Sequence, residues 1–155
     1  MFNCFNIMIR KYFTSCTKDN YFPNNDDVKW LSLDGQKLLC KVIDVYDGDT
    51  LTIVFPFCNT FFKEKCRLEG IDSAEIRTKN IEEKKYAIET KKWLSNLILN
   101  KFVYIQCGNW DKYGRLLGTI FLIENPNKSI NNMLIENNMA YQYDGKTKKC
   151  FTEWK

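Results

Sequence analysis

The sequence predicts an α+β fold, a five-stranded β-barrel of the OB type with two or three packed helices. Five apolar, β-branched segments bounded by turn residues are typical of strands. A long helical segment follows the third of them, and a short second helix begins at Ser129, a good N-cap residue. Five short strands with a helix after the third form the pattern of an OB-type barrel, whose open face commonly binds oligonucleotides.

The predicted strands are rich in Val, Ile, Leu, Phe and Thr. Because side chains alternate along a strand, Phe62, Cys66 and Leu68 in the third strand should point into the barrel. Lys63, Lys65 and Arg67 should point the other way, so that Arg67 faces an outer surface or cleft. The five predicted strands cover residues 35–46, 50–57, 60–71, 102–107 and 115–123.

The predicted long helix, residues 79–101, carries one apolar stripe at helical spacing, which is typical of a face packed on the core. We expect the short helix after Ser129 to bury an apolar face as well. The stripe of the long helix consists of Tyr86, Thr90, Trp93 and Leu97 with Ala87, Leu94 and Ile98 beside them, and the short helix offers Ile130, Met133 and Leu134.

The 155 residues suffice for a single domain with a real core. We expect an irregular N-terminal extension over residues 1–35, a domain over 36–145 and a short basic tail over 146–155. Phe151 and Trp154 leave two alternatives for the tail, which either packs against the domain or stays solvated. Residues 1–16 lack a convincing secretory signal, and a transit peptide is an open alternative. No segment approaches the roughly 20 apolar residues that span a bilayer, so we expect no membrane partner.

Charge and composition narrow the chemistry. Lys and Arg outnumber Asp and Glu by 23 to 19, a mild basic bias that allows an anionic partner. The sequence has no histidine, which excludes His general bases, His-assisted nucleophiles and His-containing zinc sites. Any catalysis must therefore rest on carboxylates, Arg, Lys, Tyr or Cys.

The seven cysteines include no C-x-x-C pair, and an odd number fits neither a full disulfide framework nor a zinc ribbon. Cys40, Cys66 and Cys107 lie in apolar runs and are most simply core residues. Because the cysteines show no disulfide pattern, we expect a reducing, intracellular (cytoplasmic) location.

The segment Asp47-Gly48-Asp49 places two carboxylates at the head of the second predicted strand. One interpretation is an ordinary hairpin turn, in which Gly supplies a positive φ and Asp accepts backbone hydrogen bonds. The other is a site for a hard divalent cation, which makes neighbouring carboxylates favourable.

A second acidic group follows Arg67. Asp72 and Glu75 are three residues apart in a predicted tight turn, and pairing of the second and third strands would bring Asp49 close to them. Calcium prefers oxygen ligands of this kind, whereas zinc would require nitrogen or sulfur. The alternative is a surface salt-bridge cluster around Arg67.

The segment 111–115, DKYGR, places a second arginine, Arg115, beside a glycine turn before the last predicted strand. Two arginines, a cation site and a spare carboxylate are what phosphodiester hydrolysis requires. The transition state needs positive charge on its equatorial oxygens, and the attacking water needs a base.

Three motifs in order resemble the staphylococcal nuclease (thermonuclease) family. They are IDVYDGDTLTI at 43–53, RLEGIDSAE at 67–75 and DKYGR at 111–115, with AYQY following at 140–143. The resemblance runs from about Lys37 to about Tyr143.

The resemblance implies a role for each matching residue. Asp49 and Asp72 would bind calcium through their side chains and Ser73 through its carbonyl, with Asp47 as a supporting acid. Glu75 would be the general base, and Arg67 and Arg115 would hold the phosphate and stabilise the transition state. The implied nucleotide contacts are Lys112, Tyr113, Tyr141 and Tyr143.

Two residues depart from the family pattern. Ala74 stands where the family has Pro, which makes the turn that presents Glu75 less rigid. Glu69 adds an acid close to Arg67, either on the outer face or in competition for that arginine.

These observations predict a monomeric, calcium-dependent nuclease that cleaves DNA or RNA with little sequence preference, favouring single-stranded or frayed substrate. Two alternatives are an inactive nucleic-acid-binding module of the same fold and a calcium-responsive interaction protein. The complete carboxylate set favours the enzyme, because a site that has lost its activity usually lacks ligands or the base.

Overall fold

The computed structural model describes residues 25–155. The chain divides into two units, Met1–Ser32 and Leu33–Lys155. In the first unit, the described residues 25–32 contain a short 3-10 helix, η2 (Asn25–Asp27). The expectations about residues 1–16, and most of the predicted irregular extension, lie outside the described residues.

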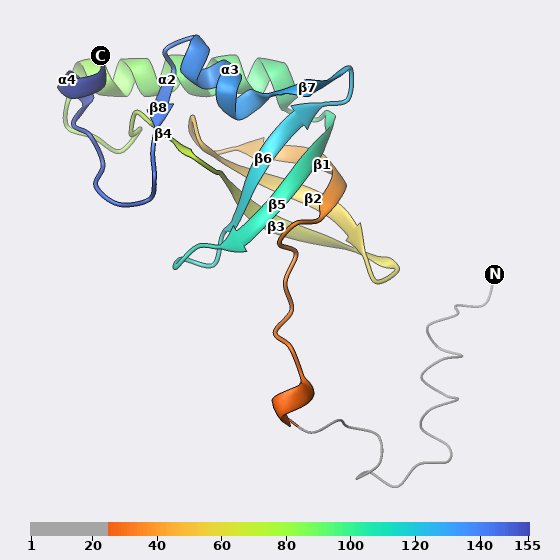
Figure 1. Ribbon diagram of the computed structural model, residues 1–155. Helices are drawn as coiled ribbons and strands as arrows, with labels where there is room; N and C mark the ends of the chain where they lie inside the picture. Colours follow the sequence, from red (N-terminus) through yellow and green to blue (C-terminus); the bar gives the residue numbers. More distant parts are fainter. Residues whose placement is uncertain (1–24) are drawn as a thin grey trace, which may run out of the picture. The chain divides into compact units, whose positions relative to one another are not determined.

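Five strands of the second unit form a closed barrel (Figure 1). Neighbouring strands follow the order β3-β2-β1-β5-β6, and a parallel pairing of β3 with β6 closes the barrel. β7 (Asn125–Ser129) pairs with the C-terminal end of β6, at Phe121 and Leu122. The barrel strands are β1 (Lys37–Val45), β2 (Thr50–Phe57), β3 (Thr60–Leu68), β5 (Phe102–Trp110) and β6 (Leu116–Leu122). The predicted fold class is therefore confirmed.

Alternating side chains fill the barrel, as strand geometry requires. In β1 the buried positions change parity, from Cys40 and Val42 to Val45, where the pairing with β2 shifts register between Val42 and Asp44. Such a bulge redirects the following side chains. The other inward residues include Leu51, Ile53, Cys66, Leu68, Val103, Ile105, Leu116 and Ile120. Phe62 was also expected to point inward, but it is 47% exposed, because only the C-terminal part of β3 packs into the core.

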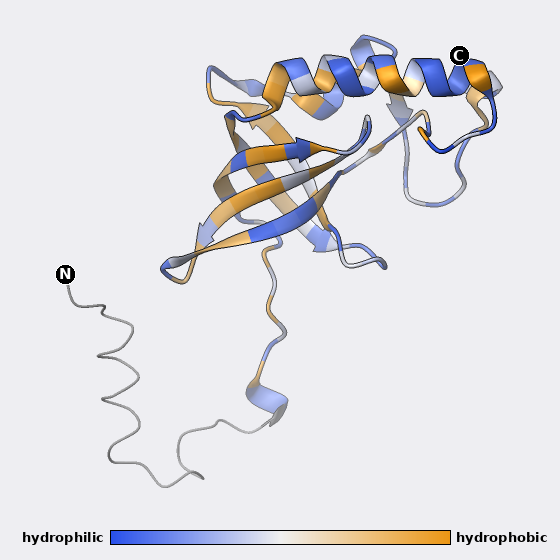
Figure 2. Cartoon of the chain, turned by 180° about the vertical axis from the view of Figure 1, so that it is seen from behind, coloured by the Kyte–Doolittle hydropathy of each residue, from blue (hydrophilic) through white to orange (hydrophobic). Residues whose placement is uncertain are grey.

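Two helices cover the barrel, and both begin at side-chain caps. The Asn80 side chain accepts hydrogen bonds from the first turn of α2 (Ile81–Ile98). Ser129 caps α3 (Ile130–Glu136), and of the two caps this is the one that the sequence predicts. Apolar and polar residues alternate around α2 (Figure 2). Its buried face consists of Ala87, Thr90, Leu94 and Ile98, with Trp93 and Leu97 partly buried.

Three short elements follow no pattern in the sequence. The third strand was expected to reach Ile71, but β3 ends at Leu68 and the chain turns at Gly70, which has a φ of 76°. After this turn β4 (Ile71–Ser73) pairs with β8 (Ala140–Gln142) in a separate two-stranded sheet. A four-residue helix, α4 (Phe151–Trp154), follows in the tail.

The tail packs against the domain, which decides between the two alternatives for it. The rings of Phe151 and Trp154 lie 5.8 Å and 5.9 Å from the ring of Tyr86, centre to centre. The Trp154 ring is also 5.1 Å from the ring of Tyr141. These rings attach the end of the chain to both α2 and β8.

The cysteines in the barrel are core residues. Cys40, Cys66 and Cys107 are buried and carry free thiols. Burial raises the pKa of the Cys40 thiol to about 12, so this group is a neutral apolar filler at physiological pH. Across the described part of the chain, no helix combines the length and the apolar character needed to cross a membrane.

Candidate active site

The two aspartates at the head of β2 have different environments. Asp47 Oδ1 accepts hydrogen bonds from the backbone N–H groups of Asp49 (3.1 Å) and Thr50 (2.7 Å), so Asp47 stabilises the turn. Asp49 is 4% exposed and its carboxylate points inward. Burial, followed by the charge of Asp49, raises the pKa of Asp47 to about 6. Asp47 therefore has the hydrogen bonds that the hairpin interpretation predicts, and both aspartates line the same cleft.

Position 48 has no room for a side chain, which explains why a glycine occupies it. We expected it to supply a positive φ, but its φ is not in the left-handed region. A Cβ atom on Gly48 would lie 2.6 Å from Thr90 Cγ2 and 2.7 Å from Ser73 Oγ. The close approach of this turn to α2 and β4 thus excludes a side chain.

Arg67 joins the two buried aspartates. Its Nη1 lies 2.5 Å from Asp49 Oδ1 and its Nη2 lies 2.7 Å from Asp72 Oδ1. Burial opposes the charge on Arg67, but the two aspartates outweigh it and raise the pKa of the guanidinium. Arg67 leaves the barrel interior as predicted and lies in a cleft, with 11% of its side chain exposed.

The pairing of β4 with β8 positions Asp72. Asp72 is opposite Tyr141 in the register, and the Tyr141 hydroxyl donates to Asp72 Oδ2 at 2.7 Å. Burial opposes ionisation of Asp72, but hydrogen bonds from Tyr141, Lys148 and Arg67 hold its pKa below the ordinary value. The Ser73 N–H donates to Asp49 Oδ2 at 3.2 Å, which links the two aspartates through the backbone.

Glu75 lies at the rim of this cluster. Its side chain is 54% exposed, and its Oε1 is 2.7 Å from Lys148 Nζ. Because Glu75 is the most accessible carboxylate of the predicted site, it can reach a water molecule in the cleft.

Arg115 approaches the cluster from the β5–β6 turn. Gly114 has a φ of 75°, which a glycine adopts without strain. Asp111 Oδ2 accepts from Arg115 Nε at 2.7 Å and so fixes the guanidinium. Arg115 Nη1 donates to Thr50 Oγ1 at 3.4 Å, and that hydroxyl donates to Asp49 Oδ1 at 2.9 Å. Hydrogen bonds through Thr50 thus connect Arg115 to Asp49.

A cleft with a volume of about 1170 Å³ gathers most of the predicted residues. Tyr141 is 7% exposed and lies behind Asp72, whereas Tyr143 lies in the cleft with its ring centre 5.9 Å from Arg67 Cζ. The predicted residues along the cleft wall are Asp47, Asp49, Arg67, Glu75, Lys112, Tyr113, Arg115 and Tyr143. The structure brings these side chains together, and their roles stay predictions.

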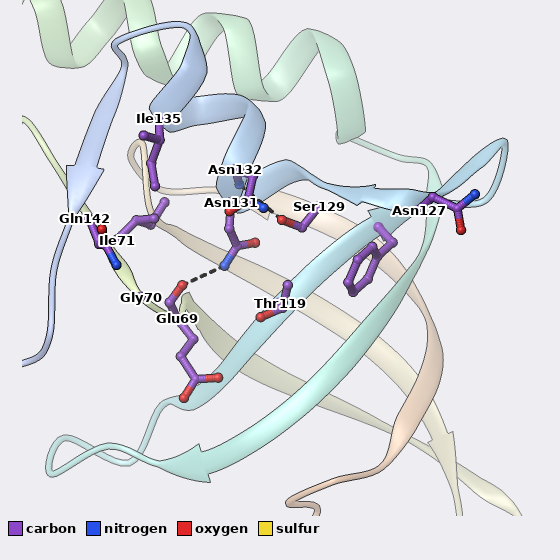
Figure 3. Close-up of a pocket in the computed structure, with 11 residues that line it drawn as sticks. Glu69, Gly70, Ile71, Thr119, Asn127, Ser129, Asn131, Asn132, Ile135 and Gln142 are labelled. Carbon is purple, nitrogen blue, oxygen red and sulfur yellow. Dashed lines mark hydrogen bonds between the residues drawn. The ribbon is translucent and has the colours of Figure 1, made fainter.

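A second, polar pocket of about 490 Å³ lies between α3, β6 and the turn that follows β3 (Figure 3). Asn131 is a structural residue there, since its Nδ2 donates to the Glu69 carbonyl at 2.8 Å. The Glu69 carboxylate lies close to the Cα of Gly108. The ion pairs of Arg67 are with Asp49 and Asp72, so Glu69 does not compete for it among the described residues.

The donor set suits a hard cation in its chemistry. Asp49 and Asp72 are buried carboxylates that share one guanidinium, and the side-chain hydroxyls of Ser73 and Thr50 lie next to Asp49. Among the described residues, no three Asp, Glu or Cys side chains form a group that could hold a metal ion. Two carboxylates and a carbonyl would therefore need oxygens from water or substrate to complete the six to eight that calcium takes.

Lys148 also lines the cleft, although no motif in the sequence points to it. Its Nζ lies 2.9 Å from Asp72 Oδ1 and 2.7 Å from Glu75 Oε1. The available signal was a run of lysines before Phe151, but nothing in that run indicates which lysine turns inward.

The fold and the cleft define an OB-type barrel protein in which two arginines and buried aspartates share one site, an arrangement that suits an anionic ligand. The family model for staphylococcal nuclease homologues matches residues 65–155, and the chain belongs to this family.

The chain is also similar to an uncharacterized endonuclease of Haemophilus influenzae. The two are 30% identical over 112 residues, which cover 70% of this chain and 54% of that relative. The chain thus aligns with about half the length of this relative.

Proposed function

We propose that the protein is a calcium-dependent nuclease that hydrolyses phosphodiester bonds of DNA, RNA or both. The observation that carries the proposal is the convergence of Arg67, Arg115 and Glu75 on one cleft beside the buried pair Asp49 and Asp72. Family membership and the similarity to a relative named an endonuclease support the same reaction class.

The two arginines would bind the scissile phosphate. A guanidinium offers a planar fork of donors that matches phosphate oxygens, and it stays charged at any physiological pH. Arg115 is oriented by Asp111, while Arg67 is oriented by the aspartates. Positive charge on both sides of the phosphate would stabilise the charge that develops in the transition state.

Glu75 would act as the general base. It is an exposed carboxylate at the rim of the cleft, so it can hold a water molecule and accept its proton. A water molecule held by Glu75 would give its proton to this carboxylate and attack the phosphorus of a phosphate held by the arginines. The P–O bond to one of the two sugars would then break, and the leaving sugar oxygen would take a proton to become a hydroxyl group.

Calcium would be held by the carboxylates of Asp49 and Asp72 and by the carbonyl of Ser73. When bound, the ion would supply positive charge to the phosphate and offset the repulsion between the aspartates. Asp47 would contribute through the turn that it stabilises, by placing Asp49.

The substrate would be recognised through its backbone. The cleft offers charged groups and the exposed ring of Tyr113, which is 73% exposed and can stack on an unpaired base. This favours single-stranded or frayed DNA or RNA with little sequence preference.

The test is release of acid-soluble fragments from heat-denatured DNA and from RNA, with millimolar calcium or with a calcium chelator. We expect calcium-dependent release by the wild type and its loss in Glu75→Gln. A matched control is Glu124→Gln, the same change at an exposed residue that is not part of the cleft lining.

A second candidate function is a nucleic-acid-binding module without activity. The ion pairs of Asp49 and Asp72 favour it, because Arg67 and Lys148 already occupy the carboxylates that would have to bind calcium. Retention of denatured DNA on the folded protein, with no fragments released in calcium, would replace the nuclease with this module. Release that does not respond to the chelator would retain the nuclease and remove calcium from the proposal.

A further inference from the structure

Lys148 enters the cleft from the C-terminal tail and contacts two acids that the proposed mechanism uses for different purposes. Its Nζ is 2.9 Å from Asp72 Oδ1 and 2.7 Å from Glu75 Oε1. One ammonium group therefore connects the proposed metal ligand with the proposed base.

The tail holds Lys148 in this place through contacts on the residues that follow it. The Lys149 N–H donates to the Tyr141 hydroxyl at 3.0 Å. Trp154 packs its ring on both Tyr141 and Tyr86, and Phe151 packs on Tyr86. Since Tyr141 also donates to Asp72, the docked tail and the acid share one hydrogen-bonded group.

Asp72 has little capacity left for another partner. Its Oδ2 accepts from Tyr141, and its Oδ1 accepts from Arg67 and pairs with Lys148. A carboxylate has about four acceptor positions, so a cation that binds Oδ1 must displace one of these donors. Lys148 is the donor that can leave, because its side chain is 46% exposed and that of Arg67 is 11% exposed.

We propose that Lys148 is a positioning residue that occupies the cation position between Asp72 and Glu75, so that a divalent metal ion must displace its ammonium group to bind Asp72 through Oδ1. The tail thereby sets the metal affinity of the site. This proposal rests on the calcium site of the proposed function.

The experiment is isothermal titration calorimetry of calcium chloride into the full chain without nucleic acid, comparing the wild type with Lys148→Met. Removing two competing ion pairs should tighten calcium binding by about tenfold. Lys148→Arg keeps the charge and should bind calcium close to the wild-type level.

Lys146→Met is the matched control. It removes the same charge from the same tail, but Lys146 pairs with Asp144, at 3.4 Å, and with neither Asp72 nor Glu75. Equal tightening in Lys146→Met and Lys148→Met would show a general effect of net charge and would overturn the specific competition.

Unchanged or weaker calcium binding in Lys148→Met would also overturn the proposal, and so would the absence of binding in every variant. An assay of fragment release distinguishes failure of the proposed role of Lys148 from failure of the proposed nuclease activity. Calcium-dependent release by the wild type with no change of affinity in Lys148→Met removes only the role of Lys148. Tighter calcium binding in Lys148→Met, with no fragments released by any variant, would contradict only the proposed nuclease activity.

Discussion

Arg67 is the residue on which the geometry of the site depends most, because its guanidinium binds two buried aspartates at once. A lysine at this position presents a point charge to the phosphate instead of a planar fork of donors. We expect Arg67→Lys to lower the rate of fragment release by about 10²- to 10³-fold, the typical cost of removing one transition-state donor.

Initial rates on denatured DNA in saturating calcium would check this expectation, with urea unfolding as a control for the fold. A folded Arg67→Lys variant that keeps most of its activity would show that the arginine does not clamp the phosphate.

Asp111 has a pKa below its ordinary value of 3.8, since hydrogen bonds from Arg115 and Tyr113 outweigh the effect of burial. A depressed pKa in the folded state stabilises the protein above the unfolded pKa, and this contribution is lost as pH falls through the folded pKa. We therefore expect Asp111→Asn to lower the free energy of unfolding by about 1 kcal/mol at pH 7.

The difference between Asp111→Asn and wild type should shrink as pH falls below about 4. Urea unfolding at pH 7, 5 and 3 measures it. A difference that stays constant with pH would mean that the charge of Asp111 does not contribute.

At the level of elements, α2 meets the β1–β2 turn through Thr90. The Thr90 Oγ1 atom is buried and has no hydrogen-bond partner among the described residues. The Thr90 Cγ2 atom lies close to where a side chain on Gly48 would be, so Thr90 packs against the turn through its methyl group. Because Val keeps the shape of Thr and removes the unsatisfied hydroxyl, we expect Thr90→Val to stabilise the protein by about 1 kcal/mol.

Thermal and urea unfolding would measure this gain. Thr90→Ser is the control, because it keeps the hydroxyl, removes the methyl group and should destabilise the protein. If Thr90→Val proved less stable than the wild type, the hydroxyl would have a partner that stabilises it.

At the level of the whole molecule, the proposed calcium site depends on folding. Asp49 follows a turn in the barrel, whereas Asp72 is positioned by a strand pair that includes residues near the end of the chain. An ion that binds only the folded state stabilises it by about 2.7 kcal/mol at one hundred times its dissociation constant. We expect calcium at this concentration to raise the free energy of unfolding by about 2.7 kcal/mol.

Urea unfolding with and without calcium tests this expectation, with Asp49→Ala as the variant that should lose the effect. An equal gain in Asp49→Ala would place the calcium site elsewhere in the protein.

Local patterns predict much of this protein. The five barrel strands, the α2 stripe and the Ser129 cap are visible because each depends on the spacing of apolar residues or on a cap next to its helix. The candidate site residues were named from short motifs, and most of them line one cleft in the structure.

The sequence by itself thus determined the barrel, its main helices and the acidic and basic residues that share the cleft. Only the tertiary structure decided the pairing of β4 with β8, the steric reason for Gly48 and the position of Lys148 between Asp72 and Glu75. Each of these depends on contacts between segments far apart in the chain. Three-residue strands and a single lysine in a basic run have no periodicity that could reveal such contacts.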